Sequence, residues 1–238
     1  AHVLSTAALG QFFVPPYAVL GQVLLMGLWV VNLLCSLVAI FSSAGAVAND
    51  VESGVLQVVL TRPLTRGQLI AGKWLGLAAL LTAYVALTSA AAMAVSLLAD
   101  GYFPAQPIVV GALLIGEVVT LLSLALALST RLPTVATAVI LVVLYAVAVA
   151  GGMLTQLGTL LRSDSMTAYG VWSEVLLPSN ALWQLAADRV QPEGFGAVGA
   201  VSPLGVIAPP SLWMAAYAAL YVAACVAAAV AIFERRDV

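Results

Sequence analysis

The chain has 238 residues, of which eight are basic, ten are acidic and 63% are hydrophobic. Charged residues make up 8% of the chain, against about 25% in ordinary soluble domains, and a mean hydropathy of +1.13 leaves more apolar surface than a soluble fold of this length can bury. The composition therefore excludes a soluble globular protein, and the formal net charge of −2 gives no reason to expect nucleic acid as a partner.

Five apolar runs are each long enough to cross a bilayer, which requires about 20 residues. In chain order they cover residues 18–41, 75–98, 107–130, 134–161 and 211–233. Prolines and glycines separate them: Pro15 and Pro16 precede the first run, and Pro209 and Pro210 open the last. We therefore expect an all-α, polytopic membrane helix bundle in which residues 1–238 form a single transmembrane domain in contact with lipid.

A polar segment, residues 49–73, lies between the first two runs and holds five of the charged residues (Asp50, Glu52, Arg62, Arg66 and Lys73). Asn49 followed by Glu52 is typical of a helix start, and predicts an amphipathic helix over 50–61 that Pro63 ends. A second helix is expected to run through Lys73 into the 75–98 span. Such a loop is either a docking site for a soluble partner or a linker helix at the membrane surface.

The distribution of basic residues predicts the orientation in the membrane. Six of the eight basic residues fall on the side of the 49–73 loop and the C-terminus: Arg62, Arg66, Lys73, Arg131, Arg235 and Arg236. Because cytoplasmic loops are enriched in Lys and Arg, we expect this side, and with it the C-terminus, to be cytoplasmic. Five spans then place the N-terminus outside, which predicts an upstream sixth helix before Ala1.

Residues 162–208 are too polar, and too rich in proline and glycine, to span the membrane, and this orientation makes them an external loop. The middle of this loop, PSNALWQLAADRV, is either a short helix at the interface or a plain loop. In the helical interpretation, four apolar side chains point toward lipid or the bundle: Leu182, Trp183, Leu185 and Ala186.

Glu117 is the acidic residue near the middle of the 107–130 run. A charged carboxylate there costs at least about 2.5–3.5 kcal/mol on a lone helix, so it is protonated, paired or facing water. Two interpretations stay open: a proton or substrate site on a transport pathway, or a neutral carboxyl hydrogen-bonded to a neighbouring Ser or Thr. Asn32 is a second candidate for the pathway. Hydrogen bonds between helices are expected from Gln22, Asn32 and Gln156.

Glycine pairs offer places where two helices can approach closely. Gly72 and Gly76 have the small-xxx-small spacing, and Gly151 and Gly152 are adjacent in the fourth run.

Two stretches resemble nucleotide-binding motifs, but each lacks a residue that its motif requires. The stretch from Gly67 to Lys73 matches a phosphate-binding loop, but Trp74 stands where the Mg²⁺-binding Ser or Thr belongs. The Gly194–Gly199 stretch matches a dinucleotide fingerprint without the acidic residue that should follow it. The single histidine is His2, so we expect no catalytic residue, no metal site and no cofactor, and any ATP hydrolysis on another chain.

Residues 50–76, DVESGVLQVVLTRPLTRGQLIAGKWLG, resemble the segment between the second and third helices of ABC-2 type transporter permeases. The subgroup that they are similar to includes the permease of nitrous oxide reductase maturation, and the ending Phe233–Val238 is also similar to that family's. Val55 departs from the Thr usual in the family. The family's six-helix plan agrees with one helix before Ala1.

This resemblance implies an exporter permease in the bacterial inner membrane, with a coupling helix seated on a separate ATP-binding subunit. The matching positions are Glu52, Gly54, Pro63, Arg66 and Lys73, and Asp50 adjoins them. It also implies two ATPase subunits and two permeases, identical or homologous. Two other functions stay open: a proton-linked secondary carrier that uses Glu117, and a non-transporting subunit of a larger membrane complex.

Overall fold

The computed structural model describes residues 16–49, 66–191 and 206–234, and within these ranges the chain is helical without a strand. The helices are α2 (Pro16–Ala44), α5 (Arg66–Asp100), α6 (Pro107–Ser129), α7 (Thr134–Leu161), α8 (Asp164–Leu176), α9 (Ser179–Val190) and α11 (Trp213–Glu234). The prediction of an all-α bundle is confirmed.

Five of these helices are long and apolar enough to cross a membrane: Leu20–Ala44, Gly67–Ala99, Pro107–Ser129, Thr134–Leu161 and Trp213–Phe233. The predicted number of spans is therefore confirmed. The second span is part of α5, which begins at Arg66, so that the polar residues and the span form one helix of 35 residues, as predicted. At 1.5 Å per residue this helix is about 52 Å long, well beyond the roughly 30 Å hydrocarbon core.

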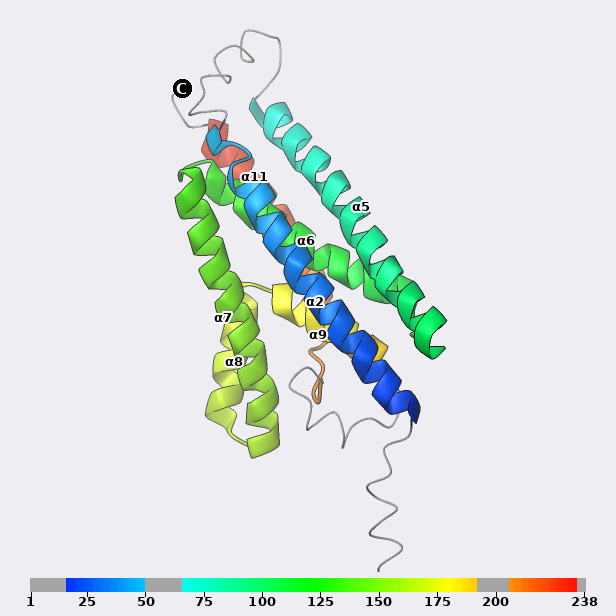
Figure 1. The fold of residues 1–238 in the computed structure, drawn as a ribbon. Helices are drawn as coiled ribbons and strands as arrows, with labels where there is room; N and C mark the ends of the chain where they lie inside the picture. The colour runs from blue at the N-terminus through cyan, green and yellow to red at the C-terminus, as the bar shows by residue number, and fades with distance from the viewer. Residues whose placement is uncertain (1–15, 50–65, 192–205, 235–238) are drawn as a thin grey trace, which may run out of the picture.

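Helix α6 is the centre of the bundle and contacts α2, α5, α9 and α11 (Figure 1). Its buried apolar side chains, among them Leu114, Val118, Leu121 and Leu122, join the main core cluster with residues of α2 and α5. Helices α7 and α8 lie antiparallel to one side, as a hairpin.

The segment after α7 is more structured than expected. Its predicted central helix exists as α9, and that helix packs against α6. The four apolar side chains expected to face lipid or the bundle (Leu182, Trp183, Leu185 and Ala186) are all buried in the protein. Helix α8 was not predicted at all, and the plain-loop interpretation of the PSNALWQLAADRV segment is wrong.

Glycines in α7 explain how α8 and α9 come so close. A Cβ added at Gly151 would lie 1.6 Å from the Ser173 Oγ, and one at Gly152 would lie 1.7 Å from the Asn180 Nδ2. The expectation of close approach is therefore confirmed at this pair. It is wrong within this chain for Gly72 and Gly76, where an added Cβ would meet nothing within 4 Å.

Replacing Gly152 by Val is expected to destabilise the protein by at least about 2–3 kcal/mol, because the new side chain overlaps Asn180 and overpacked cores rarely relax fully. Gly76→Val, in α5, is the matched control and should change stability by no more than roughly 0.5 kcal/mol. Thermal unfolding of both variants in detergent measures the difference. Equal midpoints would show that α9 does not pack on α7 as described.

Candidate functional site

The described chain at the two ends of the 50–65 segment forms a tightly bonded corner. Helix α2 ends at Ala44, and the Oγ of Ser129, the last residue of α6, accepts hydrogen bonds from the backbone N–H groups of Val47 (3.0 Å) and Ala48 (3.1 Å). The Lys73 Nζ donates to the Ala46 carbonyl. We call this group, residues 45–49 with Lys73, Ser129 and Thr134, the α2–α5 corner.

The corner is also tied to α7 and α11. The Thr134 hydroxyl, at the start of α7, donates to the Asn49 Oδ1 at 2.7 Å. A small apolar cluster buries Val47 of the corner together with Ile70 of α5, Leu126 of α6 and Phe233 of α11. A displacement of the 50–65 segment would therefore act on α5 directly, and on α6, α7 and α11 through these contacts.

The sequence-predicted coupling residues fall partly within this corner. Asp50, Glu52, Gly54 and Pro63 lie outside the described residues. Arg66 is the first residue of α5, and Lys73 is bonded within the corner, about two turns further along the same helix. Their role in coupling stays a prediction.

The ends of several helices meet at this side of the bundle. In Figure 1, the end of α2, the start of α5, the α6–α7 junction and the end of α11 lie at the same end of the bundle. The basic residues Lys73 and Arg131 are thus on one side, as the orientation requires. Which side of the membrane that is stays a prediction.

Inside the bundle, Glu117 and Asn32 are direct partners. Glu117 of α6 is 1% exposed, and its Oε1 accepts hydrogen bonds from the Asn32 Nδ2 (3.2 Å) and the Ser36 Oγ (3.4 Å) of α2. Tyr145 of α7 is buried beside them. The other carboxyl oxygen, Oε2, has no hydrogen-bond partner among the described residues. We call these four residues the Glu117 cluster.

The Glu117 cluster joins three helices and is closed to the outside. Asn32, Ser36 and Tyr145 are each exposed by 6% or less. One of the two interpretations left open by the sequence included a Ser or Thr as a partner of the carboxyl, and Ser36 is such a partner. The sequence did not predict that the two candidate pathway residues bind one another. Their place on a transport pathway stays a prediction.

A second polar network lies where α7, α8 and α9 meet. The Gln156 Nε2 donates to the Gln184 Oε1 (3.1 Å), and the Gln184 Nε2 donates to the Glu174 Oε1 (3.2 Å). The Gln156 Oε1 also accepts from the backbone N–H groups of Ile207 (2.9 Å) and Ala208 (3.2 Å). The predicted interhelical role of Gln156 is confirmed. Sequence reasoning missed Glu174, although a lone acidic residue between Trp172 and Leu177 was a usable signal.

Burial raises the pKa of Glu174 from its ordinary value of 4.5 to about 7, although the hydrogen bond from Gln184 works in the opposite direction. Between about pH 4.5 and 7 the folded protein therefore holds a proton that the unfolded chain releases. Stability should fall as the pH rises through this window and level off above it. Unfolding midpoints measured from pH 5 to 8 should show this fall in the wild type and not in Glu174→Gln. A parallel pH profile in the two proteins would contradict it.

Within the described ranges, the chain shows no group of three or more His, Cys, Asp or Glu side chains that could hold a metal ion. Its polar clusters instead connect helices: the α2–α5 corner at one end, the Glu117 cluster in the interior, and the Gln156 network beside α8 and α9. This organisation is that of a multi-pass membrane protein whose polar contacts hold spans together.

Comparison with known proteins agrees with this description. No curated protein matches the chain. The sequence model of one family, described as ABC-2 family transporter protein, matches residues 4–238. A match over nearly the whole chain, on a bundle of five apolar helices, shows the family: this protein belongs to the ABC-2 family of transporter proteins, as a multi-pass permease subunit.

Proposed function

We propose that this permease is driven by a separate ATPase subunit that docks on the 49–73 loop and moves the helices of the bundle through the α2–α5 corner. The family generally pairs with such a subunit. The observation that carries the proposal is the corner itself: Ser129, Lys73 and Thr134 bind the chain beside the loop to the ends of α5, α6 and α7. A linker that only lies on the membrane surface would not require hydrogen bonds to the ends of three helices.

The mechanism follows from these ties. ATP binding on the partner shifts the segment 50–61, which the sequence predicts to be a helix, and the shift reaches α5, a continuous helix of 35 residues that moves as a rod. The α6–α7 junction moves with it, because Ser129 and Thr134 are bonded to the same corner. The result is an opening and closing of the pathway between two permease copies, identical or homologous.

The transporter is an exporter in the bacterial inner membrane, with the corner and the C-terminus in the cytoplasm. The bias of Lys and Arg toward this end supports the orientation. The resemblance of residues 50–76 supports the direction of transport, and supports a relation to the subgroup that includes the permease of nitrous oxide reductase maturation.

Co-purification tests the proposal. The tagged chain is expressed with its genomic neighbours, and an ATPase chain is expected to accompany it in mild detergent and to hydrolyse ATP. Replacing residues 52–62 by a Gly/Ser segment of equal length should remove the ATPase. The same replacement over residues 193–203, in the loop predicted to be external, should retain it. A purified permease without any nucleotide-binding chain would instead favour a secondary carrier.

A further inference from the structure

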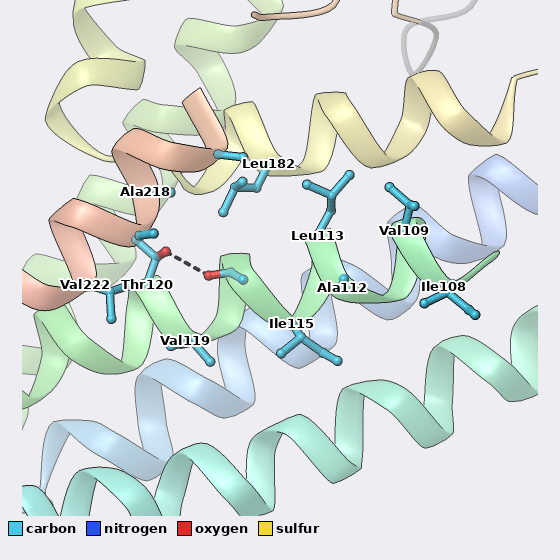
Figure 2. A pocket seen from close by; sticks show the side chains of 13 residues that line it. Ile108, Val109, Ala112, Leu113, Ile115, Val119, Thr120, Leu182, Ala218 and Val222 are labelled. Atoms are coloured by element: carbon cyan, nitrogen blue, oxygen red, sulfur yellow. Dashed lines mark hydrogen bonds between the residues drawn. The ribbon is translucent and has the colours of Figure 1, made fainter. Parts of the chain in front are cut away.

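An apolar groove of about 550 Å³ runs along the outside of α6, between α9 and α11 (Figure 2). Its floor and walls include Ile108, Ala112 and Gly116 of α6, Leu182 of α9 and Ala219 of α11. Small residues make the hollow, because Gly116 and the alanines leave space that larger side chains would fill. The groove belongs to neither the α2–α5 corner nor the Glu117 cluster.

The lining offers a ligand no hydrogen bond. Its one polar side chain, Thr120, donates to the Gly116 carbonyl of its own helix at 2.8 Å, the dashed line in Figure 2. A polar solute would lose its hydration here without compensation. The groove therefore suits hydrocarbon.

The length of the groove fits one leaflet of a bilayer. Its lining on α6 extends from Ile108 to Thr120, which is about 18 Å of helix, close to half of the roughly 30 Å hydrocarbon core. Trp213 at the start of α11 is 81% exposed, as is typical of an aromatic side chain at a membrane–water interface. A helix crossing the membrane would need a groove that continues through the other leaflet, whereas an acyl chain does not.

A pair of opposite charges lies at the Ile108 end. The Arg189 Nη1 donates to the Oε1 of Gln106 (2.9 Å), the residue that immediately precedes α6. The Asp188 carboxylate lies 3.8 Å from the Arg189 Nε, and both side chains are about one third exposed (32% and 36%). A headgroup with a phosphate and an ammonium group complements this pair: the phosphate faces Arg189 and the ammonium faces Asp188.

We propose that the groove on α6 is a binding site for a zwitterionic aminophospholipid of the leaflet at the Ile108 end. An acyl chain fills the groove between α9 and α11, and the headgroup lies on Arg189 and Asp188. The lipid covers the surface of α6 that neither α9 nor α11 reaches, and holds these three helices at a fixed spacing.

Native mass spectrometry tests the site, on the full chain purified with any subunits that accompany it. The delipidated protein is titrated with palmitoyl-oleoyl phosphatidylethanolamine or with the phosphatidylglycerol of the same chains. The first equivalent of phosphatidylethanolamine should bind at least about fivefold tighter than phosphatidylglycerol. Ala112→Trp and Ala219→Trp fill the groove from exposed positions, and each should weaken the binding of the first phosphatidylethanolamine about tenfold.

Three further variants separate headgroup, groove and general membrane surface. Arg189→Gln should weaken binding of both lipids, and Asp188→Asn should remove the preference for phosphatidylethanolamine. Ala83→Trp, on an exposed part of α5 away from the groove, should bind as the wild type does. The proposal is overturned if the groove-filling variants bind the first lipid unchanged, if phosphatidylglycerol binds as tightly, or if these variants change only the oligomeric state, which would make a second copy the occupant.

Discussion

Reversing two charges of the coupling segment, by Glu52→Lys together with Arg66→Glu, is expected to stop the permease from moving in response to nucleotide while its partner continues to hydrolyse ATP. Both residues lie in the 49–73 loop that is proposed to dock on the ATPase, and reversed charges oppose their partners across an interface, which costs several kcal/mol. Membrane insertion should be unaffected, because both positions lie outside the apolar part of the spans.

Spin labels provide a measurement that requires no knowledge of the substrate. Leu98→Cys in α5 and Leu161→Cys in α7 are both well exposed, and labels there report the separation of these helices after Cys35 and Cys225 are replaced. With ATP, the distance distribution between the labels should change in the parent and not in the double reversal.

A reversal of the same size at the opposite end is the matched control. Arg162→Glu with Asp164→Lys exchanges one exposed basic and one exposed acidic residue at the α7–α8 turn, far from the corner in Figure 1. This control should move with ATP as the parent does. If the Glu52 and Arg66 variant also moves normally, the loop is not the coupling element.

The spans could be predicted from sequence because a bilayer imposes one simple requirement, about 20 apolar residues in a row. Helix α7 was predicted with the bounds that the structure has, 134–161. Helix-breaking residues made most of these boundaries predictable, because Pro133 and Pro107 can stand at the start of a helix but not in its interior. The continuity of α5 from Arg66 also followed, since nothing between Arg66 and Leu75 interrupts a helix.

Helix α8 and the burial of α9 could not be predicted in the same way. Both depend on side chains far apart in sequence: Ser173 against Gly151, and Asn180 against Gly152. A glycine in an apolar run shows where a helix can be approached, not what approaches it. Gly72 and Gly76 have an equally good pattern and meet nothing in this chain.

The pairing of Asn32 with Glu117 illustrates the same limit. Each residue was notable alone, because polar groups in a span require a partner. Their distance of 85 positions along the chain left the pairing open, and only the crossing of α2 over α6 decides it. The Glu117 Oε1 already accepts hydrogen bonds from Asn32 and Ser36. The two interpretations of Glu117, a neutral hydrogen-bonded carboxyl and a site on the pathway, therefore differ in the role of Oε2.

Glu117→Ala is expected to destabilise the permease by about 2–4 kcal/mol, because it leaves the Asn32 amide and the Ser36 hydroxyl without their acceptor and opens a cavity in α6. Glu117→Gln should cost under about 1 kcal/mol, since an amide oxygen can accept from both donors in place of Oε1. The Gln variant is expected to be tolerated because the carboxyl that it replaces is itself uncharged. Among the described residues no basic side chain pairs with this carboxyl, and an unpaired charge at this depth of the membrane is too costly to retain. Helices α2 and α6 therefore pack around a neutral side chain at this position.

Thermal unfolding of the two variants in the same detergent separates them from each other, with Ser36→Ala as a control that removes only the longer of the two hydrogen bonds. The order of stability should be wild type, then Gln, then the Ser36 variant, then Ala at Glu117. The opposite outcome has a specific meaning. A Gln variant that folds normally but loses the ATP-dependent movement, or changes its dependence on pH, would show that the proton on Oε2 takes part in transport, because the amide keeps an acceptor oxygen for Asn32 and Ser36 but has no titratable proton.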